Sequence, residues 1–327
     1  MKSLIKFQEG NCNLSSENPI HDCSHSTALP SQTNAGGSSS ACNPKFGFLN
    51  IYKPKGMTSH DVVARLRKLT GIKQIGHTGT LDPFAEGVLP VCIGKSTRLI
   101  EYLADDKEYI ATIQFGSNTT TYDLEGEISE TFDKKVNSQE VIEALKNFEG
   151  EISQLPPLYS AIKVKGKKLY EYARKGEKVE IHPRQVTIHK IELKDFDEEH
   201  QTARILISCS KGTYIRSIAF DLGKILNCGA HLIKLIRTKA GRFSIDKSIH
   251  LEGINVEEHI INPLEILELP AIEITQSEHE RILHGQFLQN KTSKCVDFLI
   301  LIYNNSISAI GTADGDKILV KKVFDTL

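Results

Sequence analysis

The sequence predicts an α+β fold, a mixed and mainly antiparallel sheet with flanking helices, followed by a small, mostly β module. Strand-like and helix-like segments alternate irregularly, without the regular spacing of repeated βαβ units. A chain of 327 residues can hold one large domain and a smaller one. Because the pattern changes near Asn262-Pro263, we expect three parts, at 1–45, 46–262 and 263–327.

Residues 1–45 are expected to form a disordered extension without a function of its own. They are rich in Ser, Asn, Gly, Pro and His and show neither helical nor strand periodicity. The apolar start is too short for a secretory signal. An organelle transit peptide is the remaining alternative, but such peptides are rich in Arg and poor in acids. This tail has no Arg and contains Glu9, Glu17 and Asp22.

The ordered chain is predicted to begin with a strand at 46–53. Thr58 or Ser59 can then cap a helix, which carries an apolar stripe and ends at Gly71. We expect a loop, a buried strand and a short helix to follow at 72–87, 88–93 and 97–103.

Alternating apolar residues predict a further strand at 108–115, and Ser138 starts an amphipathic helix that Gly150 closes. Two strands and a helix follow at 184–195, 202–210 and 215–226. In the C-terminal module, a short helix at 277–283 precedes strand-like runs at 296–303, 307–312 and 317–324.

Composition and charge exclude some classes of protein. The 39% of hydrophobic and 25% of charged residues are those of an ordinary soluble protein. The longest apolar runs are far shorter than the roughly 20 residues of a membrane-spanning helix. With a net charge of −1, the whole chain has no bulk attraction for nucleic acid. Two basic stretches could neutralise phosphates or could be solvated faces, namely residues 163–178 and the group Lys234, Arg237, Lys239 and Arg242.

The cysteines indicate a reducing compartment. There are seven of them, scattered along the chain, and they form no C-x-x-C pair and no metal-ligand spacing with histidines. We therefore expect reduced thiols in a cytoplasmic protein and no metal site.

The segment Gly76 to Pro90 presents Asp82 on a shaped loop. Its glycines allow close backbone approach, and its two prolines stiffen the path. Loops of this kind often carry catalytic groups. On local grounds alone, however, Asp82 could equally stabilise a turn before Pro83. The loop has no phosphate-binding motif, and His77 has no recognisable triad or metal partner.

Several ordered motifs resemble the bacterial tRNA pseudouridine-55 synthase (TruB) family. The similarity covers about 45–250 in register, and its motifs stand at 52–63, 76–83, 87–94, 95–103, 107–109, 155–161, 211–216 and 230–232. The first three read YKPKGMTSHDVV, GHTGTLDP and GVLPVCIG. The resemblance implies a pseudouridine-synthase sheet and a C-terminal module that is loosely PUA-like and binds RNA.

The resemblance also assigns site residues. Asp82 is the catalytic aspartate, Arg216 pairs with it, and Tyr109 stacks on the target uracil. The other expected substrate contacts are Tyr214 and Leu235 at the pocket, His77 in the space left by the flipped base, and Lys53. Where the family commonly has Leu-Arg-Arg-Thr, this chain has Ile236 in place of the first arginine, which puts a phosphate contact in doubt.

The implied reaction is the isomerisation of a tRNA uridine, with uridine 55 in the T-arm loop as the expected target. The reaction involves no net oxidation or reduction and no transfer of a group between molecules, so we expect no cofactor. We also expect no protein partner and a monomer. An ionised Asp82 could act as a nucleophile or as a base at C2′, and Arg216 should lower its pKa. Two alternatives are a non-catalytic RNA-binding protein and a glycosidase that uses Glu86 as a second acid.

Overall fold

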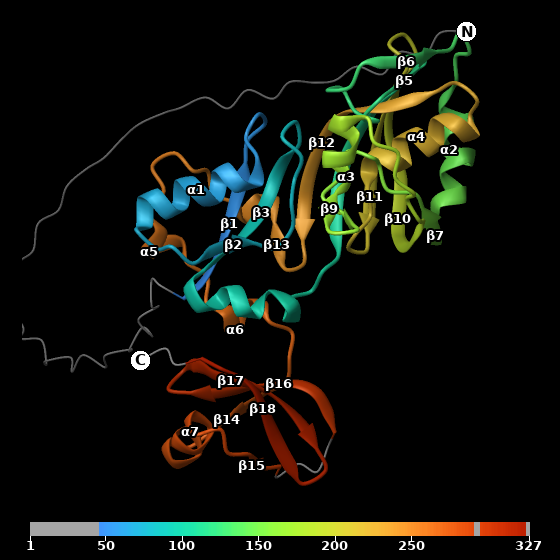
Figure 1. The fold of residues 1–327 in the computed structure, drawn as a ribbon. Helices are drawn as coiled ribbons and strands as arrows, with labels where there is room; N and C mark the ends of the chain where they lie inside the picture. The colour runs from blue at the N-terminus through green and yellow to red at the C-terminus, as the bar shows by residue number, and fades with distance from the viewer. Residues whose placement is uncertain (1–45, 291–294, 325–327) are drawn as a thin grey trace, which may run out of the picture. The chain divides into compact units, whose positions relative to one another are not determined.

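The computed structural model describes residues 46–290 and 295–324, and the predictions for residues 1–45 lie outside this range. Its largest element is a nine-stranded sheet (Figure 1). Seven strands follow the order β1-β3-β12-β4-β11-β10-β7, while β2 pairs with β3 and β13 with β12. Their bounds are β1 Gly47–Lys53, β2 Ile75–His77, β3 Glu86–Ile93, β4 Lys107–Phe115, β7 Gly150–Gln154, β10 Arg184–Asp197, β11 Thr202–Cys209, β12 Ala230–Ala240 and β13 Phe243–Ser244.

The pairing confirms the predicted mixed, mainly antiparallel sheet. Within the described ranges, every strand pair of this sheet is antiparallel except β12 with β3. The strands predicted from the patterns before residue 211 are all present. Residues 72–87 are not wholly a loop, because β2 and the start of β3 lie there, and a three-residue strand is too short to show a period.

Strand β12 was not predicted, although it lies in the middle of the sheet. Its pairing with β4 shifts register twice, between Leu232 and Lys234 and between Arg237 and Lys239. Each irregularity of this kind displaces the in-and-out alternation by one residue. The apolar pattern that identifies a strand is therefore broken in β12.

Helix α1 (Ser59–Thr70) forms as predicted. Thr58 is its N-cap and shares a capping box with Asp61, and Gly71 ends it with a φ of 69°. The predicted helix at 97–103 is instead a 3₁₀ helix, η1 (Gly94–Tyr102). Helix α2 (Ser138–Leu145) ends before Gly150, because a 3₁₀ turn, η2 (Lys146–Phe148), follows it and Gly150 begins β7.

The sheet is covered by helices that bury apolar stripes. Val141 of α2 and Ile218 and Leu222 of α4 (Ile215–Ile225) join a core with Ile113 and Ile205 of the sheet. A second core lies beneath α1, where Val62, Val63 and Leu66 pack against strands β1 and β3. These two cores hold α1 and α4, the helices that flank the site described below.

The residues after 245 form short helices and a separate sheet. The sheet order is β14-β16-β17-β18-β15, which agrees with the predicted β-rich module. Phe46, at the start of the described chain, contacts Phe324 near its end, with ring centroids 5.9 Å apart. The elements are η3 Ile245–Lys247, α5 Val256–His259, α6 Pro263–Ile266, β14 Ala271–Glu273, α7 Gln276–Leu283, β15 Leu288–Gln289, β16 Val296–Tyr303, β17 Ser306–Asp314 and β18 Lys317–Val323.

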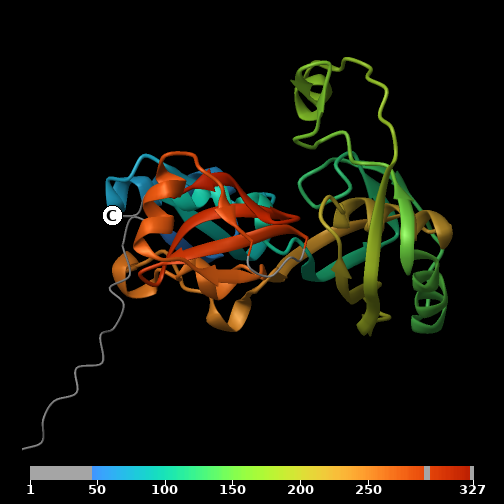
Figure 2. The same cartoon turned by 90° about the horizontal axis from the view of Figure 1, so that it is seen from below.

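Two small hairpins complete the fold, β5 (Ser117–Thr119) with β6 (Ile128–Thr131) and β8 (Lys163–Val164) with β9 (Lys167–Lys168). The second continues into helix α3 (Leu169–Lys175), and Figure 2 shows this yellow-green segment standing away from the sheet. In the described part of the chain, no helix is both long and apolar enough to span a membrane.

Candidate active site

A cavity of about 520 Å³ opens where the Asp82 loop, β4, β12 and the start of α4 meet. Its wall is made by residues far apart in the sequence. Five of the predicted site residues line it: Asp82, Tyr109, Tyr214, Arg216 and Leu235. Lys53 and His77 do not.

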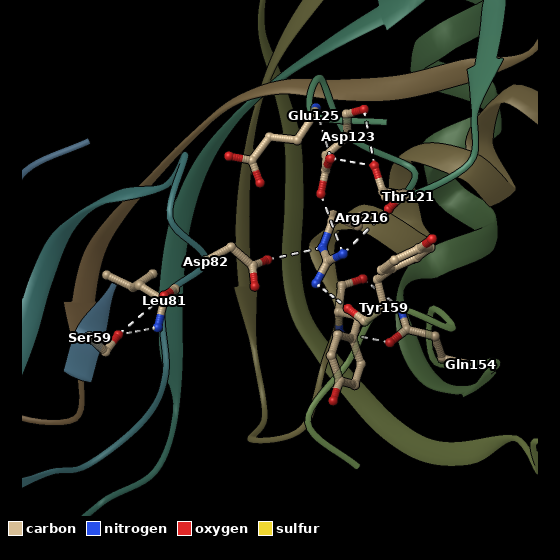
Figure 3. A network of polar contacts seen from close by, with 10 residues as sticks. Ser59, Leu81, Asp82, Thr121, Asp123, Glu125, Gln154, Tyr159 and Arg216 are labelled. Atoms are coloured by element: carbon tan, nitrogen blue, oxygen red, sulfur yellow. Dashed lines mark hydrogen bonds and ion pairs between the residues drawn. The ribbon is translucent and has the colours of Figure 1, made fainter. Parts of the chain in front are cut away.

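The loop that carries Asp82 is fixed on both sides. The hydroxyl of Ser59 accepts a hydrogen bond from the Leu81 amide at 2.8 Å and donates one to the Leu81 carbonyl at 3.1 Å (Figure 3). The carbonyl of Pro83 accepts from the Gly56 amide at 2.8 Å. Because both neighbours of Asp82 are tied to the α1 region, the carboxylate is presented from a defined backbone position.

Arg216 is bonded to two carboxylates. Its Nε lies 2.9 Å from Oδ2 of Asp82, and its Nη1 lies 3.3 Å from Oδ2 of Asp123. Nη1 also donates to the Thr121 carbonyl and Nη2 to the Tyr159 carbonyl (Figure 3). Only 7% of the Arg216 side chain is exposed, against 34% of that of Asp82. The guanidinium is therefore held by residues outside the cavity lining, while Asp82 faces the cavity.

The pKa of Asp82 is shifted upward, whereas the sequence analysis expected Arg216 to lower it. Burial raises the pKa of this carboxyl, and the nearby charge of Asp123 adds to the rise. Arg216 lowers the pKa, as predicted, but burial outweighs it, and the net shift is upward. The carboxylate of Asp82 is thus more basic than an ordinary aspartate.

Tyr109, Leu235 and Arg237 form the sheet side of the cavity. Leu235 and Arg237 are two residues apart on β12, and Tyr109 on β4 is the cross-strand partner of Arg237. Tyr109 and Leu235 are almost completely buried. Burial raises the pKa of Tyr109, and the positive charge of Arg237 opposes that rise.

Arg237 was grouped in the sequence with a basic stretch that could face phosphates, but it is completely buried. Its Nε donates to the Val88 carbonyl at 2.7 Å and its Nη2 to the Gly79 carbonyl at 3.1 Å. Other members of the stretch are paired with acids, as Lys234 is with Glu86 and Lys239 with Glu108. This stretch therefore does not form a free basic face.

Tyr214 occupies the N-cap position of α4, and Gln154 holds its backbone. The side chain of Gln154 accepts from the Tyr214 amide at 2.8 Å and donates to its carbonyl at 3.0 Å. These two bonds fix the backbone from which the Tyr214 ring and, two residues later, Arg216 project.

Lys53 and His77 lie close to the loop but outside the cavity lining. The buried ammonium of Lys53 donates to the carbonyls of Pro54, Met57 and Pro83, and burial lowers its pKa to about 8. His77 lies on β2 and is half-buried, and no described residue forms a hydrogen bond with its Nδ1. Burial and the charge of Arg237 lower its pKa.

Asp123 is the main site residue that the sequence analysis missed. It is buried, and its Oδ1 accepts from the Thr121 hydroxyl and from the Glu125 amide. An acid between a run of threonines and Gly126 is typical of a turn, so the local pattern gave no sign of a charge partner.

Comparison with known proteins places the chain in a family. Residues 67–215 match the TruB family pseudouridylate synthase N-terminal domain, and residues 216–265 match the tRNA pseudouridylate synthase B C-terminal domain. The chain belongs to the TruB family. A curated TruB relative from Caldanaerobacter subterraneus subsp. tengcongensis, called tRNA pseudouridine synthase B, is 46% identical over 283 residues, which are 85% of this chain and 99% of the relative.

A second TruB relative, the tRNA pseudouridine synthase B of Carboxydothermus hydrogenoformans, is 45% identical over 287 residues, or 85% of this chain and 98% of its own. Among solved structures, a chain of a Cbf5-Nop10-Gar1 complex is similar, with a TM-score of 0.63 and 27% identity. That similarity covers 86% of this chain and 85% of the other. The TruB fold described above is thus shared with a protein that was solved in a complex.

Proposed function

We propose that this protein converts uridine 55 in the T-arm loop of tRNA into pseudouridine, with Asp82 as its catalytic residue. The observation that carries the proposal is the placement of Asp82, which faces a cavity of about 520 Å³ while Arg216 holds it from behind. Membership of the TruB family supports the reaction and the tRNA substrate.

The reaction is a rearrangement within one nucleotide. The bond between N1 and C1′ breaks, the freed uracil turns, and C5 bonds to C1′; a proton leaves C5 and N1 gains one. The ionised Asp82 would act at the sugar or the base, and the buried walls would keep water from capturing the ribose intermediate. Tyr109 and Leu235 would hold the detached base, and Tyr109 would also assist in removing the C5 proton.

A uridine inside an RNA loop must unstack before it can enter the cavity, which costs a few kcal/mol. Stacking on Tyr109 and packing on Tyr214 would offset that cost, because base stacking on an aromatic side chain is worth about 1–3 kcal/mol. His77 would fill the space that the flipped base leaves, and Lys53 would stabilise the substrate site through the loop it anchors.

Phosphate contacts are expected at the rim of the cavity. Lys107 and Lys211 line it, and both share the one carboxylate of Asp105, at 3.6 and 3.1 Å. Because two lysines face one acid here, this pair keeps a net positive charge, unlike the one-to-one pairs of β12. The β8–β9–α3 segment carries further lysines above the sheet. Such contacts would position the RNA without reading its sequence. The enzyme would act as a monomer in the cytoplasm and need no protein partner.

A glycosidase is disfavoured by the position of its candidate second acid. Glu86 accepts a hydrogen bond from the Tyr52 hydroxyl at 3.0 Å and pairs with Lys234 at 3.5 Å. It is not among the residues that line the cavity. The other acids of the lining are also engaged, because Asp105 pairs with Lys107 and Lys211, and Glu101 pairs with Lys322. Among the residues that line the cavity, Asp82 therefore has no free second acid beside it, which suits isomerisation better than hydrolysis by paired acids.

The test is an Asp82→Asn variant with transcribed tRNA in a single-turnover assay. We expect RNA binding to persist and pseudouridine formation to stop, while the wild-type protein releases no free uracil. Substantial pseudouridine from the variant would remove Asp82 from the chemistry. Free uracil from the wild type would mean that the protein is a hydrolase.

A further inference from the structure

Tyr122 lies between two of the residues that hold Arg216 on the side away from the cavity. Its neighbours on either side, Thr121 and Asp123, both contact Nη1 of Arg216, each at 3.3 Å. The ring of Tyr122 lies on the ring of Phe220, with centroids 4.0 Å apart and planes within 16°. The segment 121–123 is therefore joined to α4 by polar contacts and by an aromatic stack.

The backbone of Tyr122 is in an uncommon conformation. Its φ is 64°, in the left-handed region, which costs a residue with a bulky side chain roughly 1–2 kcal/mol. Hydrogen bonds fix it there, because its amide donates to the Thr119 carbonyl at 3.2 Å and its carbonyl accepts from the Leu232 amide at 3.0 Å. Glycine or asparagine would adopt this conformation more readily. The presence of tyrosine indicates that its ring makes a compensating contact.

Phe220 connects this contact to Arg216. It follows Arg216 by four residues on α4, and residues spaced in this way share one face of a helix. The segment 121–123 thus docks on α4 at two points one turn apart. A two-point contact resists rotation of the segment against α4 more strongly than the polar contacts of Arg216 would alone.

We propose that the stack of Tyr122 on Phe220 is a positioning contact that holds the Thr121 and Asp123 acceptors in place and so directs Arg216 at Asp82. This inference rests on the proposed function and deepens it. Neither ring lines the cavity. Both residues act through Arg216 and not on the substrate.

The test compares Tyr122→Asn, Tyr122→Phe and Phe220→Leu under single-turnover conditions. Asparagine tolerates the left-handed backbone but removes the ring, so the variant should fold. We expect Tyr122→Asn and Phe220→Leu to slow pseudouridine formation about tenfold to a hundredfold with unchanged RNA affinity, since a small misplacement of a catalytic group costs this much. Tyr122→Phe keeps the stack and should retain the wild-type rate.

A pH profile separates positioning from general loss of structure. Arg216 lowers the pKa of Asp82, so a poorly positioned Arg216 should leave that pKa higher. In Tyr122→Asn, the loss of rate on acidification should therefore begin at a higher pH than in the wild type. The matched control is Phe196→Leu, which removes another aromatic contact, with Phe115, away from the cavity. The control should change neither the rate nor the limb.

A double-mutant cycle with Asp123→Asn completes the test. If both residues act through Arg216, their effects will be less than multiplicative. The inference is overturned if Tyr122→Asn and Phe220→Leu match the wild-type rate and pH profile, or if their effects multiply fully with that of Asp123→Asn. A wild-type protein that forms no pseudouridine in the same assay would instead refute the proposed function.

Discussion

Arg216 and Asp82 meet through Nε and Oδ2 at 2.9 Å, and the remaining nitrogens of the same guanidinium are bound to Asp123 and to two backbone carbonyls. This arrangement uses the planar shape of the group as well as its charge. A lysine at this position could supply a positive charge, but its single nitrogen could not reach all four of these acceptors.

We therefore expect Arg216→Lys to be a severe defect. Its rate of pseudouridine formation should fall at least about a hundredfold, as when a preorganised electrostatic partner is lost, with a smaller change in RNA affinity. Rapid-quench kinetics and filter binding would measure the two effects. A variant within a factor of about three of the wild type would show that charge alone is sufficient.

The raised pKa of Asp82 predicts the direction of the pH dependence. If the ionised carboxylate does the chemistry, the rate should fall on acidification at a pH above the ordinary aspartate pKa of 3.8. Removing the charge of Asp123 with Asp123→Asn should shift this limb toward lower pH, because that charge adds to the rise. Single-turnover rates across the acid range would check both statements, and a limb below 3.8 in the wild type would contradict them.

Lys53 predicts a pH dependence of stability. Its folded pKa of about 8 lies below the ordinary 10.5, so between these values the unfolded chain binds more protons than the folded one. The free energy of unfolding should therefore rise with pH over that interval. Urea unfolding at several pH values should show this rise in the wild type but not in Lys53→Met. If the free energy of unfolding changed with pH in the same way in both proteins, the lowered pKa of Lys53 would be wrong.

A substitution at Gly87 tests how closely the backbones of β3 and β12 approach each other. Its φ is 107°, and a Cβ there would lie 2.3 Å from the Arg237 carbonyl oxygen. Gly87→Ala should cost roughly 2–4 kcal/mol through strain and overpacking. Gly150→Ala is the matched control, with a φ of 82° and no atom within 4 Å of the new Cβ, and should cost only about 1–2 kcal/mol. Equal losses in urea unfolding would show that the approach is not tight.

The parts of the fold that depend on neighbouring residues could be predicted from the sequence. The capping of α1 by Thr58 and its end at Gly71 follow from hydrogen bonds within one or two turns. The fold class followed from the irregular order of strands and helices. The motifs of the TruB family added Asp82, Tyr109, Arg216 and Leu235, which local chemistry alone left undecided.

The parts of the fold and the site that depend on distant residues could not be predicted from the sequence. Arg216 is 95 positions from Thr121, whose carbonyl it binds, and no local period links Asp123 to α4. Strand β12 was missed because two register shifts break its alternation. Arg237 reads as a surface cation in a basic stretch, and only the pairing of β12 with β3 and β4 shows why it is buried.

The contact between Phe46 and Phe324 determines when this part of the core can fold during synthesis. The two rings belong to one apolar cluster, yet they lie 278 positions apart in the sequence (324 minus 46). On a ribosome, Phe46 emerges early and must wait for its partner until β18 and Phe324 have left the exit tunnel. We therefore expect this cluster to close later in synthesis than the cores beneath α1 and α4, whose residues leave the ribosome earlier.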